Sequence, residues 1–451
     1  MIKRKNRIFA FTFGHGWHFL KEEKLVHNFG FRAALNALQY DSIRSLDSFS
    51  IEDQAIHTRT QASKASAIGS FGIDIGKDIL KGVTGKPRVD VKFTNISGSD
   101  TSLGFSVKTE FQNLGTVCDT VLDLYNETTY RTNFGWVDYI KRERSGTIKA
   151  QLEQDLVDDL RSNSPDAYLA PPGVVDWERF ECFKISGGGR KTYSDLDISE
   201  YISFNDKSKI SIDTLKSHRV EFYSDSSKPH EHHWTVFRCL NFETEISKKR
   251  YFLNDGEWFA VNKEYSKRIT ESLNQLQVSG ATIPKIKRKA DGKLEHEGEY
   301  NIRVCNENPM IALMDKKTVK CLGAKSQIEV CDLLTDSRQY IHVKHKKGGS
   351  SNLSHLFMQA RNSAEALVSD ETFRKAAREK LKGLRSSWEG RITINRPNTS
   401  EIEIILAFLG SKSNLPGHEL PFFSQVSLVR TYEALISMGY KFSILGIQPE
   451  P

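Results

Sequence analysis

The residues with the clearest capacity for chemistry form an acid, turn, His-x-Lys pattern near the C-terminus. Asp332 lies in one predicted strand, a turn follows, and His342 and Lys344 lie on the next predicted strand. Because side chains two apart on a strand share a face, His342 and Lys344 project to one side, whereas Glu329 faces away from Asp332. Carboxylates can bind a divalent metal that polarises a phosphate, and a lysine can stabilise the charge that develops on it. Residues of these types at this spacing could therefore act together on a phosphate group.

The segment that follows could hold the phosphate of a substrate. Lysines and glycines lead into a predicted helix that begins at Asn352. Glycine-rich backbone, hydroxyl groups and a helix N-terminus together favour an anion. An ordinary capped loop with solvated lysines would explain the same residues. The expected phosphate-binding residues are Lys346, Lys347, Ser350 and Ser351, with His355 and Gln359 on the helix face that looks back toward Lys344.

The hairpin resembles the core of the PD-(D/E)xK nuclease superfamily, the fold of many restriction enzymes. The resemblance implies that an acid on one strand and an acid-x-Lys on the next bind Mg²⁺ or Mn²⁺, with Asp332 or Glu329 as the strand acid and Lys344 as the lysine. His342 stands where that superfamily usually has Asp or Glu, and imidazole suits Mg²⁺ less well than carboxylate does. The further carboxylates expected to supply the missing metal ligand are Glu299 and Asp315.

Other chemistry competes for the same residues. The segment from His342 to Lys344, followed by residues 349–352, resembles half of a phospholipase D-type motif, in which a histidine attacks phosphorus; the expected Asp and a second copy are both missing. An RNA-cleaving toxin that uses His342 for acid–base chemistry without metal is a further alternative. A non-catalytic nucleic-acid-binding or sensor protein would need only the basic surface. A strand hairpin with one acid and one lysine also occurs in proteins without such activity.

The net charge of the chain is concentrated beside this hairpin. The 451 residues carry a formal charge of +7. Between Arg338 and Arg391 alone there are 12 Lys and Arg against 5 Asp and Glu, an excess as large as that of the whole chain. A charge run is often only a solvated face, but one beside a candidate phosphate site is typical of contacts to a phosphate backbone, so the expected partner is nucleic acid, DNA or RNA. The basic residues that recur there at helical spacing are Arg374, Lys375, Arg378, Lys382 and Arg385.

The composition argues against several other classes of protein. No run of 18 or more apolar residues predicts a membrane span, and the apolar run 8–13 is too short for a secretory signal. The six cysteines are far apart and include no CxxC pair, which is typical of reduced thiols in the cytoplasm. A homo-oligomer is compatible with these features. Two weaker clusters remain: residues 57–64 could grip phosphate or another anion and 230–233 could bind a metal, although either could be a surface loop.

A mixed α/β framework is needed to position these residues. Turn-forming residues near 165 and a basic connector before 291 divide the chain into an N-terminal α+β domain (1–165), a middle α+β region (166–290) and a C-terminal α/β domain (291–451). In the last domain, periodicity predicts helices over 352–368, 371–385 and 426–437, and strands over 310–315, 328–334, 340–344, 401–409 and 441–447. We expect a restriction-endonuclease-like mixed sheet flanked by helices.

Beyond this core, the chain resembles a bacterial family of unknown function described as sporadically distributed proteins. The resembling stretches run nearly end to end and include 13–16, 29–36, 57–63, 299–301, 331–334, 341–344, 350–359 and 420–424. The resemblance implies patchy occurrence in bacteria, often in mobile or defence islands, and supplies no reaction. Together with the hairpin, it leads us to expect a metal-dependent endonuclease of the bacterial cytoplasm that acts against phage or mobile elements.

Overall fold

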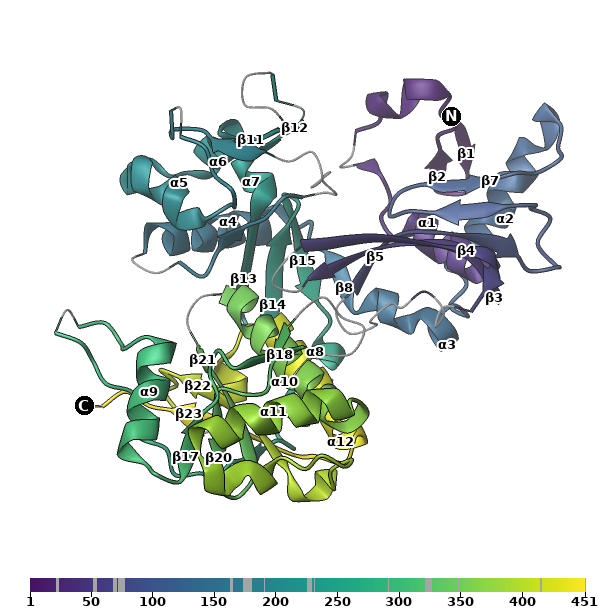
Figure 1. Cartoon of the computed structure of the whole chain (residues 1–451). Coiled ribbons are helices and arrows are strands. Elements are labelled where there is room, and N and C mark those ends of the chain that lie inside the picture. Colours follow the sequence, from purple (N-terminus) through teal and green to yellow (C-terminus); the bar gives the residue numbers. More distant parts are fainter. Residues whose placement is uncertain are drawn as a thin grey trace. The chain divides into compact units, whose positions relative to one another are not determined.

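The chain folds into two units, and both mix helices with strands (Figure 1). The first unit comprises residues 1–51 and 55–141, and the second comprises 52–54 and 142–451. The computed structural model describes residues 1–21, 24–51, 55–67, 71, 78–162, 165–172, 181–189, 191–224, 229–230, 232–290, 292–320, 327–346, 349–413 and 416–450.

A five-stranded antiparallel sheet, with helix α1 (Phe29–Ala37) on one face, forms the core of the first unit. The strand order is β4-β3-β5-β6-β7. The small residues Ala33, Ala34 and Ala37 are fully buried, which lets the helix approach the sheet closely. The helices and strands of this unit are β1 (Ile2–Arg4), β2 (Arg7–Phe9), α1, β3 (Leu38–Ile51), β4 (Ala55–Ser66), β5 (Asp78–Pro87), β6 (Ile96–Gly98), β7 (Leu103–Phe105), α2 (Leu114–Asn126) and α3 (Arg131–Phe134).

The second unit begins with two small sheets that share one hydrophobic core. Their strand orders are β8-β15-β14-β13-β9 and β10-β11-β12. Leu152, Leu156 and Leu160 of α4 are buried in the same core as residues between 167 and 260. The division at 141 therefore precedes α4, whereas the turn-forming residues near 165 suggest a boundary after it. The elements are β8 (Ile140–Arg142), α4 (Gly146–Arg161), β9 (Tyr168–Leu169), β10 (Cys182–Ile185), α5 (Ile198–Phe204), α6 (Ile212–Ser217), β11 (Arg219–Tyr223), β12 (His232–Thr235), α7 (Val236–Cys239), β13 (Leu240–Ile246), β14 (Lys249–Asn254), β15 (Glu257–Val261) and α8 (Lys263–Leu273).

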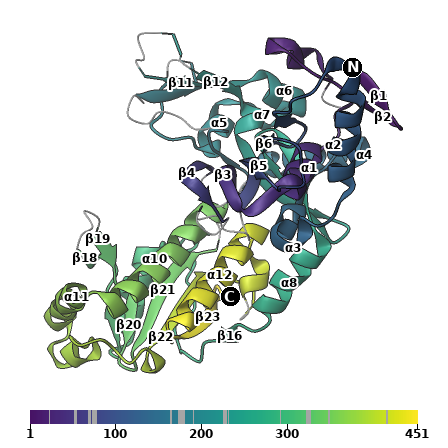
Figure 2. The ribbon, with the colours of Figure 1, turned by 90° about the vertical axis from the view of Figure 1, so that its right-hand side faces the viewer.

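A six-stranded mixed sheet follows, in the order β16-β23-β22-β21-β20-β17. The strands from β16 to β21 are parallel, and β20 and β17 continue the sheet antiparallel. Helices α10 and α12 lie over one face (Figure 2), and α9 packs on the other through Tyr300 and Val304. The elements are β16 (Gln277–Val278), α9 (Glu297–Glu307), β17 (Ile311–Leu313), β18 (Thr318–Lys320), β19 (Gln327–Glu329), β20 (Leu333–Thr335), β21 (Gln339–His345), α10 (Gly349–Ser369), α11 (Glu371–Leu384), β22 (Glu403–Leu409), α12 (Phe422–Ser437) and β23 (Lys441–Ile447).

The apolar periodicity of the C-terminal part is realised in helix α10. Its predicted apolar stripe is fully buried, at Leu353, Leu356, Phe357, Ala360, Ala364 and Leu367. One predicted strand is different, because 328–334 is divided between two sheets. Residues 327–329 pair with β18, and residues 333–335 pair with β17 and β21. The break falls at Val330–Asp332, immediately before the hairpin that carries the candidate chemistry.

The mixed α/β, multi-domain class expected from the sequence is confirmed. Short 3-10 helices connect several elements, at Gly14–Phe19, Phe111–Asn113, Gly135–Asp138, Lys207–Lys209, Ser386–Arg391, Thr399–Glu401 and Pro416–Glu419. Within the described ranges, no helix combines the length and the apolar character that crossing a bilayer requires.

Within the second unit, the partly buried carboxylate of Glu243 joins β13 to helix α12. Glu243 Oε2 accepts a hydrogen bond from the backbone N–H of Phe422, at 2.6 Å, in the first turn of α12. Arg250 of β14 donates to Gln425 in the same helix, at 2.8 Å. The positive end of the helix dipole and the Phe422 N–H favour the charged carboxylate, but burial outweighs them and raises the pKa of Glu243 to about 7.

We expect Glu243→Gln to remove a pH dependence of stability. Between pH 4.5 and about 7 the unfolded chain has lost the Glu243 proton while the folded chain still holds it, so the free energy of unfolding falls as the pH rises. In the variant, the decrease in the free energy of unfolding between pH 5 and pH 7.5 should be smaller by on the order of 3 kcal/mol, measured by urea unfolding at both pH values. Glu245→Gln, at a half-exposed position on the same strand, should leave the slope as it is. An unchanged slope in Glu243→Gln would contradict this assignment.

Candidate active site

The hairpin β20–β21 places the predicted acid beside the predicted His-x-Lys strand. The backbone N–H of Asp332 donates to Ile341 O at 3.0 Å, and Asp332 Oδ2 accepts from the backbone N–H of Val343 at 2.7 Å. Asp332 is therefore hydrogen-bonded to the residues of β21 immediately before and after His342. Its carbonyl oxygen also accepts from the N–H of Asp315, at 2.9 Å, which ties the turn after β17 to the same point. The break before β20 frees the Asp332 backbone for these contacts.

Lys344 is paired with an acid from the first turn of α9. Its Nζ lies 2.9 Å from Glu297 Oε2, and Glu297 Oε1 accepts from the backbone N–H of His345 at 3.0 Å. Both side chains are partly buried, with 22% and 31% of their surfaces exposed. A carboxylate is stabilised at this place because it lies at a helix N-terminus and beside a cation. Glu297 thus fixes the ammonium group at the carboxyl end of β21.

The helical acid of the site is Glu297 rather than the expected Glu299. Glu299 accepts from the N–H of the N-cap residue His296 at 2.9 Å, and its other contact is an ion pair with Lys289 at 2.7 Å. The hydrogen bond and charge of Lys289 lower the pKa of Glu299. Glu299 therefore caps its own helix. The sequence shows two acids in the segment Glu-Gly-Glu at the start of α9. Which of them contacts Lys344 depends on the direction from which α9 approaches β21.

Carboxylates gather around Asp332. The pKa of Asp332 is raised to about 7. Burial is the main cause, the hydrogen bond from the Val343 N–H opposes it, and the charges of Asp315, Glu329 and Glu297 add to the rise. Asp315 reaches toward the start of α9, since a Cβ on Gly298 would lie 3.7 Å from Asp315 Oδ2. The charges of Asp315 and Glu329, two carboxylates that the sequence analysis names, therefore act on Asp332, and the charge of Glu297 acts on it as well. A carboxyl group with a pKa near neutrality can exchange a proton at physiological pH.

His342 lies on the buried face of β21. Its side chain is 1% exposed, and burial lowers the pKa of the imidazole to about 4, so that the ring is neutral. Its Nε2 has no hydrogen-bond partner among the described residues. His342 is opposite Leu406 of β22, on the face covered by α10. In this arrangement neither a metal nor a substrate arriving from solvent reaches the ring.

The expected phosphate-binding residues whose side chains the structure describes, Lys346, His355 and Gln359, have separate surroundings. Lys346 forms an ion pair with Glu419, which also accepts from Ser413 Oγ at 2.7 Å. His355 is exposed on α10, and Gln359 donates to Glu329 Oε2 at 2.8 Å. Gln359 is thus the one member shown in contact with an acid of the site. Lys347 lies outside the described residues, as do the side chains of Ser350 and Ser351, whose backbone forms the first turn of α10.

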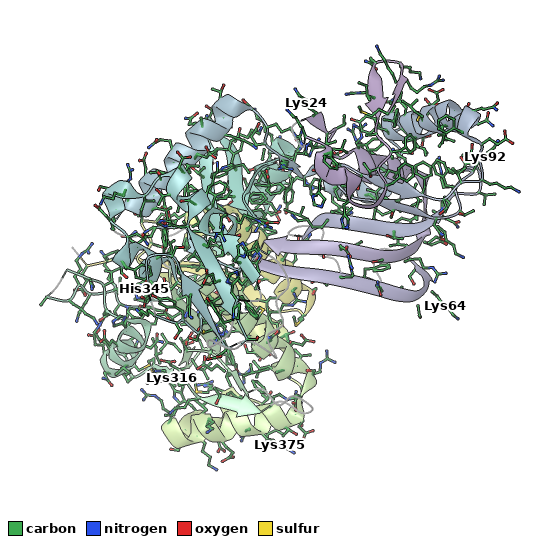
Figure 3. The ribbon with its side chains drawn as sticks, turned by 90° about the horizontal axis from the view of Figure 1, so that it is seen from above. Lys24, Lys64, Lys92, Lys316, His345 and Lys375 are labelled. Atoms are coloured by element: carbon green, nitrogen blue, oxygen red, sulfur yellow. The ribbon has the colours of Figure 1, made fainter. Side chains whose placement is uncertain are left out.

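Several basic side chains of helix α11 form hydrogen bonds or ion pairs within the fold. Arg374 is 6% exposed, and its guanidinium donates to the backbone carbonyls of Leu367, Val368 and Ile394 at 2.8–3.2 Å. Arg378 and Lys382 both pair with Glu389, at 3.2 and 3.3 Å. Lys375, labelled in Figure 3, remains 56% exposed. The net charge that the sequence concentrates here is therefore only partly presented on the surface.

Comparison with known proteins places the chain in a family without assigning an activity. A family model described as a family of unknown function, DUF6119, matches residues 1–448. The chain belongs to this family. No curated protein and no solved structure matches it. Membership of DUF6119 confirms the uncharacterised family that the sequence suggests and assigns no activity to the chain.

The donor atoms of this DUF6119 site suit a hard divalent cation. Carboxylate oxygens are the ligands that Mg²⁺ and Mn²⁺ prefer. In the part of the chain that the structure describes, no three His, Cys, Asp or Glu side chains are grouped closely enough to hold a metal. Mg²⁺ is commonly bound by one or two carboxylates and completed by water and substrate phosphate. Asp332 and Glu297 fit such a partial site, whereas a closed cage of protein ligands does not fit.

Proposed function

We propose that the chain is a metal-dependent nuclease that cleaves nucleic acid, with DNA favoured, in the cytoplasm of bacteria that resist phage or mobile elements. The observation that carries the proposal is the contact of Lys344 with Glu297, whose charge also acts on the partly buried carboxyl of Asp332. An acid immediately before β20 and a lysine on the adjacent strand β21, together with a further acid, are groups that phosphodiester hydrolysis with Mg²⁺ or Mn²⁺ can use. The mixed sheet supports the proposal because it sets the Asp332 segment against the strand of Lys344.

Each residue has a distinct role in this proposal. Asp332 and Glu297 would hold the cation, which polarises the scissile phosphate and lowers the pKa of a water molecule. Lys344 supplies positive charge to the phosphate oxygens as negative charge develops on them. Asp315 and Glu329 keep the site acidic and raise the pKa of Asp332, while Gln359 orients Glu329. His342 supports the strand from inside the sheet.

A single cleavage assay separates the alternatives. The purified chain is incubated with supercoiled plasmid DNA and with single-stranded RNA, each in Mg²⁺, in Mn²⁺ and in EDTA. Metal-dependent nicking or linearisation supports the nuclease. RNA cleavage that survives EDTA would instead indicate a metal-independent toxin, which the burial of His342 disfavours. Salt-sensitive binding without cleavage would replace the enzyme with a non-catalytic binding protein or sensor.

We predict opposite results for two acids of the same helix. Glu297→Gln removes the charge that faces Lys344 and Asp332, so the cleavage rate in Mg²⁺ should fall by about 10²-fold or more. Glu299→Gln changes a cap and a surface ion pair only, so its rate should stay within about threefold of wild type, with a small loss of stability. The rates are measured under single-turnover conditions. Equal losses in both variants would contradict the assignment of Glu297.

A further inference from the structure

A group of exposed aromatic side chains follows the first hairpin of the chain. Phe11, Phe13 and Phe19 are 40%, 87% and 90% exposed. His15 and His18, which are also exposed, stack on each other with their ring centroids 6.0 Å apart. Large apolar side chains that gather on a surface in this way mark a site for a partner. We call residues 11–19 the aromatic segment.

The hairpin β1–β2 anchors the aromatic segment to the first unit. Arg4 forms an ion pair with Asp119 of α2, and Phe9 packs edge-to-face on Phe29, with ring centroids 6.2 Å apart. Beyond Phe9 the rings become exposed. Gly14, whose φ is +55°, begins the 3-10 helix Gly14–Phe19. The start of the aromatic segment is therefore fixed to the unit while its rings face solvent.

Basic side chains lie on both sides of the aromatic segment in the sequence. Residues 1–24 contain six Lys and Arg against two Glu, and Asp119 and Asp123 of α2 face two of the cations. An excess of positive charge therefore remains. Figure 3 labels one of these cations, Lys24. The exposed cations are Lys3, Lys5, Arg7, Lys21 and Lys24.

We propose that the aromatic segment binds single-stranded nucleic acid, with bases stacked on its rings and phosphates held by the flanking cations. Every base presents a π-face on which an aromatic side chain can stack, and positive charge along the strand adds affinity without reading its sequence. In a duplex those faces are covered by the neighbouring base pairs. Exposed rings therefore favour an unpaired strand, and the charge of its phosphates complements the basic residues.

An anionic membrane is the other partner that aromatic and basic side chains can suit. Segments that lie on a membrane are typically amphipathic helices with one continuous apolar face. The helix of the aromatic segment spans six residues, and His15 and His18 give it polar rings. Stacking on bases needs flat rings and no continuous apolar face, so a single strand fits better. This inference goes beyond the proposed nuclease, because it assigns a binding surface in the other unit and holds whether or not the chain cleaves its ligand.

Fluorescence anisotropy with the full chain tests the proposal. The probe is a labelled oligothymidylate of about 20 nucleotides, alone or annealed to its complement, in EDTA so that metal-dependent cleavage does not contribute. We expect the single strand to bind at least about tenfold more tightly than the duplex. Phe13→Leu and Phe19→Leu each remove a ring and keep an apolar side chain, and each should weaken binding about tenfold. Phe13→Tyr keeps the ring and should bind like wild type.

A ring elsewhere in the first unit provides the matched control. Tyr40 of β3 is 44% exposed and lies beside Phe134 of α3, which Figure 1 shows well away from the N-terminus. Tyr40→Leu should therefore leave the affinity for the oligothymidylate unaltered. Arg7→Gln should lower the slope of log affinity against log salt by about 0.7, the value for one phosphate contact with a single strand. Lys92→Gln, at the position that Figure 3 shows apart from Lys24, should leave the slope as it is.

Three results would overturn the proposal. They are equal affinity for the single strand and the duplex, unchanged affinity in both leucine variants, and cosedimentation with phosphatidylserine vesicles without binding of the oligothymidylate. The last result would assign the surface to a membrane. Because Phe13 and Phe19 face solvent, both leucine variants should melt at the wild-type temperature, so that weaker binding reports the loss of a ring. Since no cleavage is measured, failure of the nuclease proposal would leave these results unaffected.

Discussion

Replacing Lys344 with methionine is expected to lower the rate of nucleic acid cleavage by about 10²–10³-fold, the usual effect of removing one charge that stabilises a transition state. Methionine keeps the unbranched stem of the side chain and removes the ammonium that lies 2.9 Å from Glu297. The variant should still fold, because the pair is partly exposed and contributes about 1 kcal/mol. Single-turnover cleavage of plasmid DNA in Mg²⁺ gives the rate, and circular dichroism checks the fold.

The control for this variant is a lysine at the amino-terminal end of the parallel strands of the same sheet. Lys441 is the exposed first residue of β23. In the register of the parallel strands it is level with Gln339, the first residue of β21, whereas Lys344 lies near the carboxyl end of β21. Like Lys344→Met, Lys441→Met removes one positive charge from the second unit, but at a distance from the carboxylates around Asp332. Its cleavage rate should therefore equal that of wild type. Retention of activity in Lys344→Met, within about threefold, would remove the basis for the nuclease proposal.

Arg374→Met is expected to be among the most destabilising single substitutions in the second unit. The guanidinium of Arg374 donates to three backbone carbonyls at the junction of α10, α11 and the segment before β22. Methionine fills a similar volume but leaves those carbonyls unpaired in a buried place, which costs roughly 1–3 kcal/mol for each group. We expect a loss of about 3 kcal/mol or more, seen as a lower urea midpoint by circular dichroism.

The neighbouring lysine provides the contrast. Lys375 is 56% exposed and pairs with Glu371 one turn earlier, so Lys375→Met should change stability by less than about 0.5 kcal/mol. Loss of nucleic acid affinity in Arg374→Met without a lower midpoint would mean that Arg374 contacts the ligand rather than the fold. The pair of variants thus separates basic residues that build α11 from those that could face a phosphate backbone.

Local patterns were enough to identify several elements of the C-terminal part. The spacing of Leu353, Leu356 and Phe357 predicts the buried stripe of α10, because a helical period of 3.6 residues depends only on the chain itself. The tight turn between Asp332 and Lys344 likewise makes their strands neighbours, since a short connection leaves antiparallel pairing as the simplest arrangement. These predictions concern residues close together in the sequence.

Long-range contacts decided the rest. Glu297 and Glu299 are two residues apart and chemically identical, and only the approach of α9 to the end of β21 selects Glu297 for Lys344. The same holds for Arg374, which helical spacing groups with exposed basic residues although the chain before β22 covers it.

The sequence by itself determined the mixed α/β class and the residue types of the proposed site, an acid shortly before a His-x-Lys strand. The tertiary structure alone decided that Glu297 is the carboxylate in contact with Lys344, and that Arg374 is buried while Lys375 stays exposed. The physical reason is that residue type and periodicity follow the chain, whereas burial and the partner of a charge depend on segments that meet only in the fold.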